Sequence, residues 1–125
     1  MAVLKGLKKY QDQEIGLMRF CESESEMDVR STYCAAAVYF MITTSLNEAE
    51  RKIVADDPDE YSFDQKKMIR GLREECEGLS GGFTTTPNYE SHSGLTYCAL
   101  AALKLLGQKL TVYEFERTID FLVAR

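Results

Sequence analysis

The chain contains an internal repeat, and this repeat limits the folds that are open to it. The four residues T-Y-C-A at 32–35 recur at 96–99. Upstream of each copy, the segments 5–8 (K-G-L-K) and 70–73 (R-G-L-R) are also alike. A repeat of this length predicts a series of similar structural units that pack on one another. We expect each unit to consist of an outer helix, a loop that contains glycine, and an inner helix.

Two further segments complete this division of the chain. Residues 120–123 resemble the start of a third copy of the unit. Residues 47–66 hold most of the extra length between the first two units, and they are polar and charged. Such a stretch predicts a solvent-facing insertion. We expect one domain over 1–125, interrupted by this insertion.

Length and composition agree with one compact domain. The chain has 125 residues, 45% of them hydrophobic, which is enough for one core. Its net charge of -5 argues against a nucleic-acid surface, because phosphate binding needs clustered Lys and Arg. No apolar run reaches the roughly 18 residues of a membrane span. The apolar stretch at the N-terminus is too short for a signal peptide, so we expect a cytoplasmic protein.

The pattern of the four cysteines also indicates a cytoplasmic protein. None of them forms a C-x-x-C pair, and two lie in apolar segments that we expect to be helical. This usage is typical of reduced, mostly buried thiols in a cytosolic protein. The cysteines are Cys21, Cys34, Cys76 and Cys98.

Marked helix starts predict an all-α protein. Asp28 is a candidate N-cap for a helix through 35–41, and Gly107 is a candidate C-cap for the helix that carries 99–106. No stretch alternates with period two for long enough to predict a strand. Three segments match the capping box, in which a hydroxyl and a Glu or Gln cap each other's backbone N–H groups: 45–48, 62–65 and 111–114.

The expected helices fall into two classes. The segments 32–42 and 96–106 are apolar on nearly every side, so we expect them to be enclosed on all faces. The segments at about 64–76 and 112–124 are amphipathic, so they should face water on one side. Alternation of these classes predicts two concentric layers of helical hairpins. This architecture is a partial α/α toroid, in which the inner helices line a central cavity.

Three segments resemble the β subunits of protein prenyltransferases. Residues 27–35, M-D-V-R-S-T-Y-C-A, are similar to the family's D-V/M-R-x-x-Y-C-A segment. Residues 81–83, G-G-F, and 90–98, E-S-H-S-G-L-T-Y-C, are similar to its G-G-F and E-S-H-G-G-x-T-F-C segments. Residues 8–11 resemble the end of the outer helix that precedes the first of these. The resemblance covers nearly the whole chain except the insertion.

The resemblance implies an enzyme that transfers a geranylgeranyl or farnesyl group from its diphosphate to the cysteine of a C-terminal CaaX sequence. It implies a zinc ion that presents the substrate thiolate, and a partner α subunit. The family's zinc ligands lie in a D-x-C segment and at a distant His, and no D-x-C occurs here. We therefore expect no metal ligand in this chain and assign no catalytic residue. Because the family's ring has six hairpins, this chain could be a piece of a larger subunit, a truncated gene model or a degenerate relative. We favour a piece, which is expected to be inactive alone.

His92 is the principal candidate site residue. It is the only histidine and directly precedes an inner helix, where backbone N–H groups attract phosphate. By its residue type alone, His92 could equally be an ordinary surface or capping histidine. The resemblance implies that His92, with Gly94, binds the isoprenoid diphosphate. Ser93 stands where the family has Gly, and Leu95 stands where farnesyl-specific relatives have Tyr, which favours the type I geranylgeranyl enzyme.

Further residues are expected to line the isoprenoid or peptide cavity. Arg30 could pair with Asp28 or Glu26, or reach into the cavity beside the peptide substrate, and the resemblance favours the cavity. The aromatic and thiol candidates could instead be ordinary core residues. The expected cavity residues are Arg30, Tyr33, Leu95 and Cys98.

A second class of function stays open. The chain could be a non-catalytic toroid module that binds an apolar ligand or a partner helix. Terpene cyclases also build α/α toroids, but this sequence has no Trp and no D-x-D-D segment, which argues against them.

Overall fold

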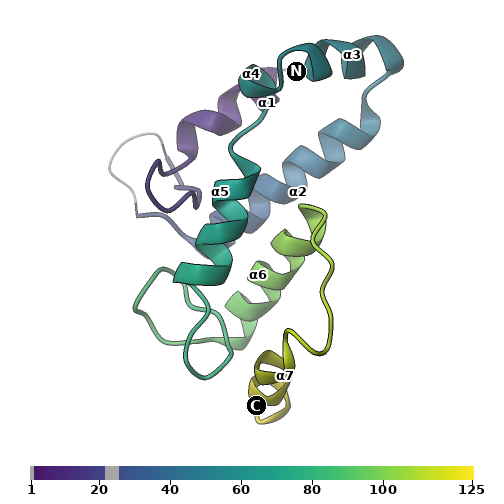
Figure 1. Ribbon diagram of the computed structural model, residues 1–125. Coiled ribbons are helices and arrows are strands. Elements are labelled where there is room, and N and C mark those ends of the chain that lie inside the picture. Colours follow the sequence, from purple (N-terminus) through teal and green to yellow (C-terminus); the bar gives the residue numbers. More distant parts are fainter. Residues whose placement is uncertain (1, 22–25) are drawn as a thin grey trace.

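The computed structural model describes residues 2–21 and 26–125, and this part of the chain is helical apart from isolated β-bridges in its loops. The predicted all-α class is therefore confirmed. The two longest helices, α2 (Val29–Ser45) and α6 (Ser93–Leu105), run side by side, with α5 (Gln65–Arg70) packed across them (Figure 1). They form the inner layer of a partial α/α toroid.

The remaining elements lie around these two helices. In the described residues, no helix combines the length and the apolar character that a membrane span needs. The outer layer begins with α1, continues through α5 into a π-helical turn, and ends with α7. The bounds are α1 Ala2–Leu7, a 3-10 turn Lys8–Tyr10, α3 Glu48–Asp56, α4 Pro58–Tyr61, the π-helical turn Gly71–Glu75, and α7 Glu116–Val123.

The repeat is visible in the hydrogen bonds that join each loop to its inner helix. The backbone N–H of Met18 donates to Thr32 Oγ1 at 2.9 Å, and the N–H of Phe83 donates to Thr96 Oγ1 at the same distance. Each threonine hydroxyl donates in turn to the carbonyl four residues earlier, at 2.8 Å in both copies. Both threonines are fully buried. The two units therefore share the same internal scaffold.

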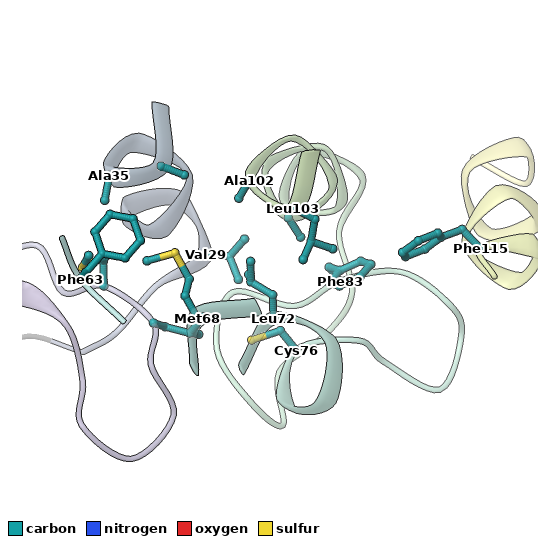
Figure 2. Packing of buried hydrophobic residues seen from close by; sticks show 14 residues of the cluster. Val29, Ala35, Phe63, Met68, Leu72, Cys76, Phe83, Ala102, Leu103 and Phe115 are labelled. Carbon is teal, nitrogen blue, oxygen red and sulfur yellow. The ribbon is translucent and has the colours of Figure 1, made fainter. Parts of the chain in front are cut away.

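The core lies where α5 and its π-helical turn meet the two inner helices (Figure 2). Val29 of α2, Met68 of α5, Leu72 of the π-helical turn and Leu103 of α6 are completely buried. Burying such side chains contributes about 1.5–3 kcal/mol each. This packing holds α2 and α6 in place relative to each other.

The expectation that both inner helices are enclosed on all faces is wrong for the described chain. Phe40 and Met41 near the end of α2 are 46% and 58% exposed, and Tyr97 of α6 is 63% exposed. Each inner helix has an inner-helix neighbour on one flank, so its other flank stays open to solvent.

The cysteines are less buried than the sequence predicts. Only Cys76 is buried, Cys98 is half-buried, and both Cys21 and Cys34 are exposed. The prediction of mostly buried thiols is therefore wrong. Cys34 lines an open groove that α2 forms with Leu7 at the end of α1, whereas Cys98 lines the cleft that α6 forms with α2.

Two of the predicted helix caps are confirmed. The side chain of Asp28 accepts a hydrogen bond of 2.6 Å from the N–H of Arg30, so it caps α2. Gly107 has a φ of +84°, and its N–H donates to the carbonyl of Lys104 just beyond the end of α6. This left-handed glycine ends the helix as the sequence predicts.

The capping box predicted at Ser45 is wrong. The hydroxyl of Ser45 donates to the carbonyl of Met41 at 2.8 Å, so Ser45 remains in the last turn of α2. The box forms two residues later, where Asn47 and Glu50 cap each other with two hydrogen bonds of 2.9 Å. A Ser side chain at such a boundary can donate to a carbonyl of the preceding turn or accept from an N–H of the following helix. Which bond forms depends on whether the preceding helix continues through the residue.

The box predicted at 62–65 is displaced, and the one predicted at 111–114 forms only in part. Asp64, not Ser62, caps α5 by accepting from the N–H of Lys67 at 3.0 Å. The side chain of Gln11 holds Asp64 in place, because its Oε1 accepts from the Asp64 N–H at 2.8 Å. Thr111 does accept from the N–H of Glu114 at 3.2 Å, but it stabilises only a turn. The following helix begins at Glu116, not near residue 112.

The segment 47–66 folds into two short helices at the surface. Neither α3 nor α4 has a buried residue, whereas Phe63, which follows them, is buried against the core. An ion pair of 2.8 Å between Lys5 and Glu60 joins α4 to α1.

Candidate functional site

A cleft of about 430 Å³ lies at the N-terminal ends of α2 and α6. It forms there because the shared loop scaffold starts both inner helices at the same level, beside the loop 83–91. Its lining is mostly apolar, with a few polar groups at one end. The lining residues are Arg30, Thr85, His92, Gly94, Leu95 and Cys98.

His92 is the N-cap of α6. Its Nδ1 accepts a hydrogen bond of 3.0 Å from the backbone N–H of Gly94. An accepting Nδ1 carries no hydrogen, so the neutral ring carries its hydrogen on Nε2. The residue is exposed, and its ring edge is available to the cleft. His92 therefore presents an N–H donor at the start of a helix whose dipole also favours an anion.

Gly94 allows this arrangement because it has no side chain. A Cβ at Gly94 would lie 3.2 Å from Nδ1 and 3.3 Å from Cε1 of His92. These separations are tighter than ordinary carbon contacts, so a larger residue would push the ring away from its capping position. The contact places Gly94 beside the His92 ring, and the shared role in diphosphate binding that the resemblance implies for the two residues stays a prediction.

Arg30 pairs with Asp28 and also lines the cleft, and its role beside a peptide substrate stays a prediction. Its Nη2 lies 2.8 Å from Oδ2 of Asp28, and its Nε donates to both carboxylate oxygens at 3.2 and 3.3 Å. The Asp28 hydrogen bonds and charge raise the pKa of Arg30. The guanidinium also lies over the ring of Phe20, at 5.7 Å from its centre. Although paired, the Arg30 side chain is 60% exposed and lines the cleft.

Cys98 and Leu95 form the apolar wall of the cleft. Burial raises the pKa of the Cys98 thiol, the nearby Cys34 and Asp28 raise it further, and Arg30 lowers it. Because the net direction is upward, the thiol stays protonated at neutral pH. A protonated thiol is a poor nucleophile, so Cys98 is suited to lining the cleft.

Tyr33 is not among the residues that line this cleft. Its ring lies 5.9 Å from that of Tyr97, at an angle of 58°, across the contact between α2 and α6. A hydrogen bond with Tyr97 raises the pKa of Tyr33. The structure therefore brings together five of the six predicted site residues, and Tyr33 contacts Tyr97 outside the lining of the cleft. Its cavity role stays a prediction.

Sequence reasoning missed Thr85, which also lines the cleft. Its carbonyl accepts from the N–H of Val29 at 3.0 Å, so the loop 83–91 is joined to the first turn of α2. The sequence did contain a signal for Thr85. It lies between the G-G-F segment and the E-S-H segment, so it belongs to the loop that leads to His92.

The described residues do not offer a metal site. No group of three His, Cys, Asp or Glu side chains within residues 2–21 and 26–125 could hold a metal ion. The zinc that the resemblance implies therefore does not fit these residues. The chemistry that the cleft offers is anion binding at one end and apolar contact along its wall.

Comparisons with known proteins agree with this geometry. The model of the Prenyltransferase alpha-alpha toroid domain family matches residues 1–125. This chain belongs to that family. It is similar to the geranylgeranyl transferase type-1 subunit beta of Arabidopsis thaliana, with 35% identity over 66% of this chain and 18% of the relative. It is also similar to the same subunit of Dictyostelium discoideum, with 26% identity over 96% of this chain and 30% of the relative.

Other relatives are named as farnesyltransferase subunits. The protein farnesyltransferase subunit beta of Pyricularia oryzae is 31% identical over 80% of this chain and 20% of the relative. Among solved structures, Candida albicans protein geranylgeranyltransferase-I complexed with GGPP matches with a TM-score of 0.63 and 22% identity, over 96% of this chain and 32% of that one. The structural match supports the toroid fold. The chain spans between about a fifth and a third of the length of these relatives.

Proposed function

We propose that this chain forms part of the β subunit of a cytoplasmic protein prenyltransferase. That subunit transfers a geranylgeranyl group from its diphosphate to the cysteine of a C-terminal CaaX sequence, and it works with an α subunit. The observation that carries the proposal is the placement of His92 as the cap of α6, with its Nε2 donor at a cleft that also contains Arg30.

The cleft suits a ligand that has an anionic end and a long apolar end. His92 Nε2–H and the N-terminus of α6 are the donors for the diphosphate, and Gly94 keeps the ring in position. When the carbon–oxygen bond of the isoprenoid diphosphate breaks, negative charge grows on the diphosphate. Donors held in advance at that place stabilise the transition state more than the ground state.

The apolar wall of the cleft and the Arg30 guanidinium are proposed to contact different substrates. Leu95 and Cys98 contact the first part of the isoprenoid, where their apolar surfaces replace water. Arg30, held by Asp28, lies beside the path of the CaaX peptide. The zinc of the family reaction belongs to other parts of the subunit, and no step here depends on it.

Two observations favour geranylgeranyl over farnesyl. Leu95 offers no hydroxyl donor to the diphosphate, where farnesyl-specific relatives have Tyr. The Arabidopsis relative, at 35% identity, and the Dictyostelium relative carry geranylgeranyl transferase names, although others carry farnesyltransferase names.

Calorimetric titration of the full chain with four ligands tests the proposal. The ligands are geranylgeranyl diphosphate, farnesyl diphosphate, geranylgeraniol and inorganic diphosphate. We expect both isoprenoid diphosphates to bind, the geranylgeranyl one more tightly, and the alcohol to bind at least about tenfold more weakly. If the alcohol binds as tightly as its diphosphate, the chain is an apolar-ligand module, and the transferase proposal is wrong.

A further inference from the structure

Residues 84–86, in the loop that precedes α6, are three consecutive threonines with different surroundings. Thr84 is buried, and its hydroxyl donates to the carbonyl of Thr86 at 2.7 Å. Thr86 is also buried and lines a separate pocket of about 280 Å³. Thr85 is half-buried and lines the cleft at the N-terminal ends of α2 and α6. The middle threonine is therefore the one that belongs to the candidate site.

The hydroxyl of Thr85 takes no part in holding the loop together. Within residues 2–21 and 26–125, no hydrogen bond joins this hydroxyl to another group of the protein. The hydroxyls of Thr84 and Thr96, by contrast, donate to backbone carbonyls at 2.7 and 2.8 Å. A threonine hydroxyl has one hydrogen to donate and two lone pairs, so Thr85 keeps all of these for a molecule in the cleft.

The backbone that carries this hydroxyl is held at both ends of the loop. The carbonyl of Thr85 accepts a hydrogen bond of 3.0 Å from the N–H of Val29, in the first turn of α2. The N–H of His92 donates to the carbonyl of Phe83 at 3.0 Å, which joins the two ends of the loop. Both bonds use backbone atoms alone, so they do not depend on which side chain stands at position 85. The free hydroxyl is thus carried on a backbone that is fixed before any ligand binds.

The other donors at the polar end of the cleft are partly committed to bonds within the protein. Nδ1 of His92 caps α6 and uses the N–H of Gly94, so the ring offers Nε2 to a ligand. The N–H of Thr96 donates to the carbonyl of His92 at 2.9 Å. The Arg30 guanidinium is shared with the carboxylate of Asp28. A diphosphate has several charged oxygens, and each accepts hydrogen bonds, so a single ring N–H leaves most of them without a partner.

We propose that the hydroxyl of Thr85 is a second donor to the diphosphate of the isoprenoid substrate, beside Nε2–H of His92. The inference rests on the proposed function and adds one binding residue to the same cleft. Thr85 and His92 are carried by one loop and line one cleft, so a single ligand group contacts both. Because the loop is already fixed, little ordering is needed when the ligand binds, and the donor is in place as charge grows on the leaving diphosphate.

Thr85→Val in the 125-residue chain tests the inference. Valine has nearly the same shape as threonine and keeps the backbone bond to Val29, so the substitution removes the hydroxyl alone. Calorimetric titration should show that the affinity for geranylgeranyl diphosphate falls by about 10- to 150-fold, because a hydrogen bond to a charged group is lost. The affinity for geranylgeraniol should be nearly unchanged. If Thr85 only packs the loop, valine replaces it and neither affinity changes.

Two further variants control for effects on the loop itself. Thr85→Ser keeps a hydroxyl at the same place and should retain the preference for the diphosphate over the alcohol. Thr86→Val makes the same chemical change one residue further along, where the side chain lines the separate pocket beside Arg19 and Met27. It should leave the affinity for geranylgeranyl diphosphate unchanged. A loss in Thr86→Val as large as that in Thr85→Val would assign the effect to the loop and overturn the inference.

The same titrations separate this inference from the proposed function. If the wild-type chain prefers the diphosphate and Thr85→Val keeps that preference, the inference is wrong and the proposed function stands. Equal losses for the alcohol and the diphosphate in Thr85→Val would mean that Thr85 shapes the cleft, which also overturns the inference alone. A wild-type chain without a preference for the diphosphate would overturn both.

Discussion

Nδ1 of His92 accepts a hydrogen bond of 3.0 Å from the backbone N–H of Gly94. This one contact caps α6 and also fixes the ring's tautomer, so that Nε2 is left as a donor toward the cleft. Capping uses Nδ1 and the proposed diphosphate binding uses Nε2, so substitutions can separate the two.

His92→Asn should weaken binding of geranylgeranyl diphosphate and leave the fold intact. Asn is a good N-cap, so it keeps the start of α6, but it is shorter and presents no donor at the place of Nε2. Losing a hydrogen bond to a charged group costs about 1.5–3 kcal/mol, which corresponds to about 10- to 150-fold in affinity. Calorimetric titration measures this loss.

His92→Ala is the companion variant. It should lose the same affinity and also about 1 kcal/mol of stability, because the cap is removed. Binding of geranylgeraniol should be nearly unchanged by either substitution. Equal losses for the alcohol and the diphosphate would mean that His92 shapes the cleft and does not contact the diphosphate.

Thr96→Val should destabilise the chain by about 1–3 kcal/mol, because the buried N–H of Phe83 loses its acceptor. Thr96→Ser keeps the hydroxyl and should cost less. The corresponding change in the first unit, Thr32→Val, should have a similar effect, since Met18 depends on it in the same way. Urea unfolding measures all three variants. A neutral Thr96→Val would contradict the view that this hydrogen bond supports the repeat.

Stability should fall at alkaline pH through Cys76. Burial raises the pKa of this thiol from 9.0 to about 12, and the charge of Glu75 adds to the effect. Because the folded-state pKa is the higher one, the stabilisation is complete below pH 9 and is lost as the pH rises toward 12. The slope for one thiol is at most about 1.4 kcal/mol per pH unit.

Urea unfolding at pH 7, 9 and 10.5 measures this dependence. Cys76→Ala should remove the Cys76 contribution to the fall, while Cys34→Ser, at an exposed position, should leave it unchanged. An identical fall in the Cys76→Ala variant would assign the pH dependence to other groups.

The dialysed chain should hold no stoichiometric zinc. A closed zinc site needs four ligands from Cys, His, Asp or Glu, and the described residues offer no group of three. Elemental analysis by mass spectrometry after dialysis measures the zinc content. One zinc per chain would contradict the prediction that this chain contains no metal ligand.

Several features could be read from the sequence because they depend on short-range geometry. Asp28 and Gly107 cap their helices wherever those helices pack, since a cap needs only the next turn of backbone. The repeat predicted the shared scaffold, because T-Y-C-A places a threonine hydroxyl at the same point of both units. The position of His92 before an apolar helix predicted a place at a helix start, and His92 is the N-cap of α6.

The tertiary structure decided the features that depend on neighbouring elements. Ser45 continues α2 and does not start α3, because its hydroxyl bonds backward to Met41. Tyr33 contacts Tyr97 and does not line the cleft. Cys34 is exposed and Cys98 is half-buried, although the two occupy equivalent positions in the repeat. Equivalent residues differ in this way because burial depends on which flank of a helix has a neighbour. The sequence alone determined the unit and its hydrogen bonds, and only the packing of one unit on the next determined which faces are covered.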